Sequence, residues 1–102
     1  MQKIEETFNN TLNMIRNKEV LASKLSEEQK LVLYRYYKQA TVGDCYVEEP
    51  DIMDYESYVK WKAWMSVKGT DKETAMKEYI CHYNLLLQMY CLTTYFDSNH
   101  SL

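Results

Sequence analysis

The sequence predicts an all-α protein built as a single bundle of four helices. Apolar residues recur at spacings of three and four, which is the period of one helix face. Glycine and proline are scarce, with two and one respectively in 102 residues, and they fall between the periodic segments. No segment alternates apolar and polar residues in the manner of a strand. A chain of this length holds one compact core, so a second domain is excluded.

The first helix is predicted from an apolar stripe of Ile4, Phe8, Leu12 and Ile15. The polar stretch over residues 17–24 then contains a turn. Ser26, followed three residues later by Gln29, is typical of an N-cap with a capping box. The second helix is therefore expected to run from Ser26 to about Val42, where Gly43 ends it.

The second helix carries two distinct faces. One arc holds the expected core residues, which are Val32, Leu33, Tyr36 and Ala40. A second arc on another side of the helix holds Tyr34, Tyr37 and Lys38. Two aromatic rings and one ammonium group at i, i+3 and i+4 can bind a nucleotide, by stacking on the base and neutralising phosphate. The same pattern is also typical of half-buried packing, so both interpretations stay open at this point.

An irregular acidic loop is predicted over residues 44–55, which contain Pro50 and show no periodicity. Loops of this length in small domains often have a functional role. A third helix is expected from about Ser57 to Lys68, and Gly69 ends it. One side of this helix carries Tyr58, Trp61 and Met65.

The fourth helix is expected to begin after Thr70 or Asp71 and to run to about Thr94. Its apolar stripe is broad and comprises Ala75, Met76, Tyr79, Ile80, Tyr83, Leu86, Leu87 and Tyr90. The folded domain is therefore predicted to span residues 1–95. Residues 96–102 are predicted to form a polar, flexible C-terminal tail.

Composition and motifs exclude several classes of function. Fifteen acidic residues against twelve basic ones argue against nucleic-acid binding, which needs a basic surface. Three cysteines and a polar N-terminus favour the cytoplasm over secretion. No nucleophile elbow, phosphate-binding glycine loop or paired metal-ligand motif is present. We therefore expect no enzyme activity, no metal and no cofactor, and we expect cysteines such as Cys81 to lie in the core or at its boundary.

Residues 34–44 have the sequence YRYYKQATVGD, which resembles the YxxYKQATVGD signature of the acyl-CoA-binding protein family. Other matching segments follow in the family's order, namely Pro50 with Asp54 and Tyr55, KWKAW at 60–64, and Lys68-Gly69-Thr70 before Ala75-Met76 and Tyr79-Ile80. The resemblance covers most of the chain. It implies an up-down-down-up four-helix bundle, with a long loop between the second and third helices, that binds long-chain acyl-CoA without chemistry.

The resemblance also implies roles for individual residues. Tyr37 would stack on the adenine ring of the ligand. Lys38 and Lys60 would hold the ribose 3′-phosphate, and the Tyr34 hydroxyl would add a hydrogen bond. Tyr79 would help to pack the acyl or pantetheine portion.

The sequence departs from the family pattern at several places. Arg16 stands where the family usually has a lysine near the nucleotide, and an arginine supplies the charge with a planar fork geometry. Glu49 and Glu56 replace basic residues that many members carry, so each reverses a local charge. The first connection, around residues 20–24, is longer than usual. The preferred acyl-chain length is therefore not implied by the resemblance.

The fourth helix carries a second apolar line, Leu85, Met89 and Leu92, opposite its core stripe. An exposed scatter or a tail folding back explains this line, and a surface for self-association or membrane contact is the alternative. We expect a monomeric carrier that delivers acyl-CoA to the enzymes using it, with dimerisation through this helix and transient membrane contact left open. The competing interpretation is a helical interaction module that has weakened or lost ligand binding.

Overall fold

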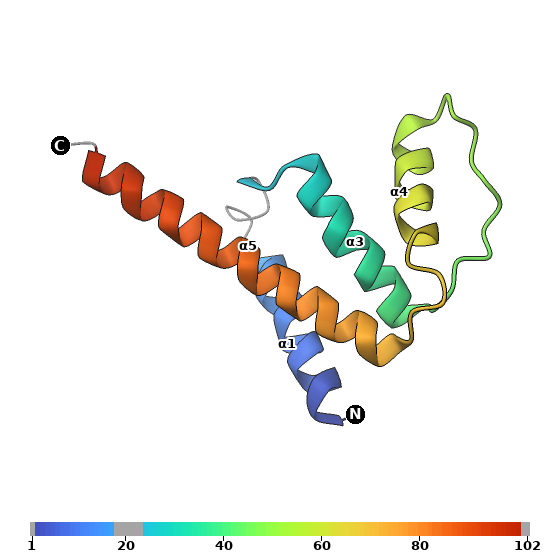
Figure 1. The fold of residues 1–102 in the computed structure, drawn as a ribbon, viewed down its shortest axis with the longest axis horizontal. Helices are drawn as coiled ribbons and strands as arrows, with labels where there is room; N and C mark the ends of the chain where they lie inside the picture. Colours follow the sequence, from blue (N-terminus) through green and yellow to red (C-terminus); the bar gives the residue numbers. More distant parts are fainter. Residues whose placement is uncertain (1, 18–23, 101–102) are drawn as a thin grey trace.

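The computed structural model describes the backbone of residues 2–17 and 24–100, and the side chains of 3–13 and 24–89. Within these residues the secondary structure is entirely helical, which confirms the predicted all-α class (Figure 1). The four helices found there are α1 (Gln2–Asn17), α3 (Glu27–Thr41), α4 (Tyr55–Met65) and α5 (Lys72–His100).

The helices follow the expected up-down-down-up order, which Figure 1 shows directly. Helix α3 packs against both α5 and α4, and α1 packs against α5. Because α3 and α4 run in the same direction, the chain must return along the full length of α4 before that helix can begin. Residues 42–54 form this return, and they explain why the connection is long.

Local capping chemistry sets the ends of α3 as predicted. The Ser26 backbone N–H donates to Gln29 Oε1 at 2.8 Å, and the Gln29 backbone N–H donates to Ser26 Oγ at 3.1 Å, so the capping box is complete. At the other end Gly43 has a φ of +99°, in the left-handed region that favours glycine. Its N–H donates to the Lys38 carbonyl at 3.2 Å and closes the helix.

The start of α4 differs from the prediction, whereas the start of α5 agrees with it. Helix α4 begins at Tyr55 rather than near Ser57, because the Asp54 carboxylate caps it by accepting from the Ser57 N–H. Helix α5 begins after Asp71, whose side chain accepts from Thr74 as a cap.

The backbone of α5 stays helical to His100, so the predicted end near Thr94 is wrong. The flexibility of residues 96–102 stays a prediction. Residues 84–96 contain no proline or glycine that would stop a helix. Among the described residues, none of the helices has a stretch both long and apolar enough to cross a bilayer.

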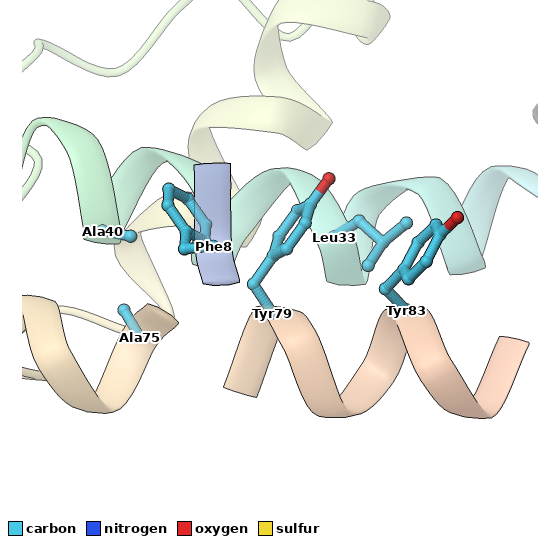
Figure 2. Close-up of a cluster of buried hydrophobic side chains, with 6 residues drawn as sticks. All are labelled: Phe8, Leu33, Ala40, Ala75, Tyr79 and Tyr83. Atoms are coloured by element: carbon cyan, nitrogen blue, oxygen red, sulfur yellow. The ribbon is translucent and has the colours of Figure 1, made fainter. Parts of the chain in front are cut away.

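The core lies between α1, α3 and α5. Its fully buried members are Phe8, Leu33, Ala40, Ala75, Tyr79 and Tyr83. Figure 2 shows Tyr79 and Tyr83 rising from α5 towards α3, while Ala40 faces Ala75. Two alanines facing each other let α3 and α5 approach closely, and the two tyrosine rings fill the space further along.

The predicted core face of α3 is only partly correct. Leu33 and Ala40 are buried, but Val32 and Tyr36 remain partly exposed. Gln39, which has no apolar character, is 1% exposed. Its Nε2 donates to Asp44 Oδ1 and to the Thr70 carbonyl, each at 2.7 Å, so burial of the amide nitrogen is compensated by hydrogen bonds. The buried Gln39 Oε1 has no hydrogen-bond partner among the described residues.

The cysteines also depart from expectation. Cys45 is buried at 1% exposure beside Trp64 and Val67, whereas Cys81 is exposed on α5 rather than part of the core. Both thiols are free.

The Asp44 carboxylate ties the end of α3 to the turn before α5. Its Oδ1 accepts from the Gly69 N–H at 2.8 Å as well as from Gln39. These hydrogen bonds, the Gly69 bond first, lower the pKa of Asp44 below its ordinary value of 3.8. Because the folded-state pKa is depressed, this stabilisation is complete above pH 3.8 and is lost as the pH falls through the folded value.

Replacing Asp44 by alanine should therefore lower the Tm by a few degrees at neutral pH. The difference in Tm from the parent should shrink in acid, because the parent itself loses the carboxylate bonds there. Thermal unfolding followed by circular dichroism from pH 7 to pH 2 measures both effects. Glu48→Ala, an exposed change in the adjoining loop, is the control and should leave the Tm unchanged. A difference for Asp44→Ala that stays constant across this range would contradict the assignment.

Candidate functional site

Two lysines from neighbouring helices lie over aromatic rings along the seam between α3 and α4. Lys38 Nζ of α3 is 4.7 Å from the ring centroid of Trp64 on α4. Lys60 Nζ of α4 is 5.9 Å from the ring centroid of Tyr34 on α3. Each helix therefore supplies one cation and one ring. The contacts cross between the helices, which brings Tyr34, Lys38 and Lys60 together as the sequence pattern predicts.

The rings that support the lysines are themselves held in place. Tyr34 and Trp64 pack in one apolar cluster, which also contains Cys45 and Val67. The Trp64 indole N–H donates to the Gly43 carbonyl at 2.9 Å, and only 6% of the residue is exposed. The platform beneath Lys38 is therefore rigid. Trp64 belongs to the KWKAW motif, but no role was predicted for it from the sequence, because its position beside Lys38 depends on how α4 docks.

The two ammonium groups have different electrostatic surroundings. Lys60 Nζ donates to Glu56 Oε1 at 3.0 Å, one helical turn away. This hydrogen bond and the negative charge of Glu56 raise the pKa of Lys60, which keeps the lysine charged. No carboxylate of the described side chains forms an ion pair with Lys38. The site thus combines a cation available for an anionic ligand with one already shared with a carboxylate.

The remaining tyrosines of the predicted site lie closer to the core. Tyr37 is partly buried and packs against the cluster that contains Phe8 and Leu33. Tyr79 is 4% exposed, and its ring meets the Phe8 ring edge-on at 5.3 Å between centroids. The structure therefore gives Tyr79 a core position. Its contact with a ligand stays a prediction.

An open groove lies on another side of the same helix pair. Its volume is about 410 Å³, and its lining comprises Glu28, Leu31, Val32, Arg35, Val59, Lys62, Ala63 and Ser66. Lys60 and Lys62 both flank Trp61, so by sequence either could supply a second cation, but Lys62 lines this groove. Positions two apart on a helix point about 200° from one another, so Lys60 and Lys62 cannot share a face. The groove floor is aliphatic, which suits a hydrocarbon chain.

Two predicted features lie outside the described side chains. These are Arg16 near the end of α1 and residues 20–23 of the long connection predicted around 20–24. Among the side chains that are described, no three histidine, cysteine, aspartate or glutamate groups gather as metal ligands.

Known proteins match both the sequence and this arrangement. The family model described as acyl CoA binding protein matches residues 5–83. This chain belongs to the acyl-CoA-binding protein family. The crystal structure of Oryza sativa acyl-CoA-binding protein 2 superposes with a TM-score of 0.79 at 36% identity, covering 88% of this chain and 95% of that one. The fold implied by the signature is thereby confirmed.

Relatives in the family vary in length. The acyl-CoA-binding domain-containing protein 6 homolog of Dictyostelium discoideum is 40% identical over 84 residues, which is 82% of this chain but only 29% of that protein. Diazepam-binding inhibitor-like 5 of Rattus norvegicus is 47% identical over 60 residues, or 59% of this chain and 69% of that protein. The family match ends at residue 83, so the last part of α5 lies beyond it.

Proposed function

We propose that this chain binds long-chain fatty acyl-CoA thioesters and carries them without catalysing a reaction. The observation that carries the proposal is the pair of ammonium groups, Lys38 and Lys60, held over rings along one helix seam. Membership of the acyl-CoA-binding protein family supports it. The proposed ligand-binding residues are Arg16, Tyr34, Tyr37, Lys38, Lys60 and Tyr79.

The polar end of the ligand suits the seam. Lys38 has no carboxylate partner among the described side chains, so a phosphate can supply its counter-charge. Each charge-assisted hydrogen bond contributes about 1.5–3 kcal/mol. In this proposal Lys38 and Lys60 hold the ribose 3′-phosphate, and the Tyr34 hydroxyl donates to it. Tyr37 stacks on the adenine ring with the face that does not pack on the core.

The hydrocarbon end needs an apolar surface, and the groove between α3 and α4 offers one. Leu31 lies on α3 next to the face that carries Lys38, and Val59 precedes Lys60 on α4. We assign the acyl chain to this groove. Burial contributes about 0.8 kcal/mol per methylene before ordering costs, so each added methylene in contact raises affinity by up to about fourfold.

Titration calorimetry with CoA, octanoyl-CoA and palmitoyl-CoA tests the proposal. Affinity should rise with chain length, and Val59→Ser, which adds no charge beside Lys60, should flatten this rise while leaving the affinity for CoA itself unchanged. Glu73→Asp, an exposed conservative change on α5, is the control for general damage. Absence of heat with every ligand would overturn the proposal and favour an interaction module that keeps the fold without binding the ligand.

Glu56 competes with the proposed phosphate for Lys60. Removing its charge in Glu56→Gln should therefore raise the affinity for CoA, by about two- to fivefold, because exposed ion pairs are worth about 0.2–1 kcal/mol. Titration of this variant with CoA measures the change. Glu73→Gln, which removes the partner of Lys77 at the same spacing on α5, is the matched control.

The gain from Glu56→Gln should shrink when Lys60 is already alanine, since the carboxylate then has no cation to hold. An equal gain in both backgrounds would show that Glu56 acts by repelling the ligand directly. Such a result would remove Lys60 from the proposed contact.

The proposal also covers the setting of this function. We place the carrier in the cytoplasm, where the free thiols of Cys45 and Cys81 stay reduced. Its partners would be enzymes that use acyl-CoA, and it would need no cofactor. Dimerisation or membrane contact through α5 stays a prediction. The exposure of Leu85 and Met89 is compatible with both, and Met89→Glu tested by light scattering separates a dimer from a monomer.

A further inference from the structure

Large apolar side chains remain exposed along the connection between α3 and α4. At the start of α4 and just before it, Ile52 is 66% exposed, Met53 is 88% exposed and Tyr55 is 71% exposed. We call these three residues the loop-tip surface. In Figure 1 this part of the chain stands at the far end of α4, away from α1 and α5. No other helix is therefore placed to cover it.

The backbone that presents these side chains is held by hydrogen bonds. The Trp61 indole N–H donates to the Val47 carbonyl at 2.8 Å, which ties the loop to the middle of α4. Nearer the tip, the Met53 N–H donates to Asp51 Oδ1 and the Asp54 N–H donates to the Asp51 carbonyl, each at 2.9 Å. The tip is therefore a hydrogen-bonded turn, and its backbone holds the apolar side chains toward solvent.

The connection is acidic along its sequence, although Glu56 already pairs with Lys60 at 3.0 Å and Asp44 lies at its other end, beside Gly69. Residues 44–56 contain six of the fifteen acidic residues of the chain and no lysine, arginine or histidine. Glu48 and Glu49 are exposed beside Pro50, and neither forms an ion pair with a described cation. An apolar surface within a negative field attracts basic partners and repels anionic ones, including the anionic leaflet of a membrane.

We propose that the loop-tip surface, together with Glu48 and Glu49, docks a basic amphipathic segment of another protein. The partner's apolar side chains cover Ile52 and Met53, and its lysines or arginines meet the carboxylates. Tyr55 of this surface lies five residues before Lys60 on α4. This inference goes beyond the proposed function and does not depend on acyl-CoA binding.

A designed amphipathic peptide of leucine and lysine, acetylated and amidated, is the probe. Fluorescence anisotropy of the labelled peptide against the intact chain should show saturable binding, and the same peptide with glutamate in place of lysine should bind at least tenfold more weakly. Equal binding of both peptides would overturn the proposal, because charge would then have no part in recognition.

Two variants test the surface itself. Ile52→Ser with Met53→Ser should weaken binding of the lysine peptide tenfold or more, since both side chains lose their buried contact. Glu48→Gln with Glu49→Gln should weaken it about three- to tenfold at low salt, and less at high salt. Asp51 and Asp54 are left intact, because their side chains hold the turn and the helix cap.

Matched controls separate this surface from the general acidity of the chain. Glu5→Gln with Glu6→Gln removes the same charge from the exposed side of α1, and Leu85→Ser with Met89→Ser removes exposed apolar groups from α5. Both should leave peptide binding within twofold of the parent. A loss in either control equal to that of the loop variants would overturn the proposal. The proposal would also be overturned if the lysine peptide failed to bind while the chain bound phosphatidylcholine vesicles through Ile52 and Met53. That result would assign the surface to a membrane.

Discussion

Replacing both Lys38 and Lys60 by alanine is expected to weaken palmitoyl-CoA binding by roughly a hundredfold or more. Each lysine is assigned a charge-assisted contact of about 1.5–3 kcal/mol with phosphate, and the two come from different helices, so neither can take over the other's geometry. The salt dependence of binding should flatten as well, because fewer charges then meet the ligand. Titration calorimetry at two salt concentrations measures both changes.

The chain offers matched controls for this experiment. Lys30 and Lys77 are exposed lysines that, like Lys60, pair with a glutamate on their own helix, at 3.6 Å in each case. Lys30→Ala with Lys77→Ala should change affinity by less than about twofold, since exposed ion pairs contribute little. Lys38 also contacts Trp64, so far-UV circular dichroism must show that the double variant keeps its helicity. An affinity within threefold of the parent would remove these lysines from the site.

Phe8→Ala is expected to have the largest effect on stability, a loss of about 3–5 kcal/mol in the free energy of unfolding. Phe8 is 2% exposed and meets Tyr79 edge-on at 5.3 Å, so it is the buried apolar side chain through which α1 attaches to α5 among the side chains described. Truncation leaves a cavity that the rigid rings of Tyr79 and Tyr83 cannot fill. The free energy of unfolding of a small domain is only about 5–15 kcal/mol in total, so the variant should be close to unfolding at physiological temperature.

Urea unfolding followed by circular dichroism measures this loss. Asn9→Ala, an exposed change on the next residue of α1, is the control and should alter the free energy of unfolding by less than about 0.5 kcal/mol. A loss below about 1 kcal/mol for Phe8→Ala would show that α1 contributes little to the core. The packing described for α1 and α5 would then be wrong.

The two predictions bear on different parts of the molecule. Phe8 and Tyr79 belong to the core between α1, α3 and α5, whereas Lys38 and Lys60 lie on the seam between α3 and α4. Tyr37 connects them, because it precedes Lys38 on α3 and packs against the core cluster. Its replacement by alanine therefore combines a stability loss with any loss of stacking, and the lysines give the cleaner test of binding.

Local chemistry explains why so much of the fold was predictable from the sequence. The capping box of Ser26, the left-handed turn at Gly43 and the apolar stripe around Phe8 each depend on residues a few positions apart. The predicted start of α4 was wrong because the local signals there are ambiguous. Asp54 and Ser57 are both acceptable caps, and only the chain path decides that Asp54 is used.

Helical periodicity predicted part of the arrangement of the candidate site, and the ligand contacts of its residues stay predictions. The signature over residues 34–44 placed Tyr34, Tyr37 and Lys38 on one arc, and helical periodicity alone explains that. Tyr79 was predicted to belong to the apolar stripe and to contact the ligand. The structure places it in the core against Phe8, and its contact with a ligand stays a prediction. The spacing of apolar residues along α5 does not show which neighbouring helix covers a given face of it.

The sequence by itself determined the helices, the breaks between them and the family, because these follow from short-range periodicity, capping and a contiguous motif. Tertiary structure alone decided which long-range neighbours meet. It placed Lys38 over Trp64 and buried Gln39 between Asp44 and Thr70. Each of these contacts depends on how α4 docks on α3 after the long return of residues 42–54. Docking is set by the packing of whole surfaces, which no local pattern specifies.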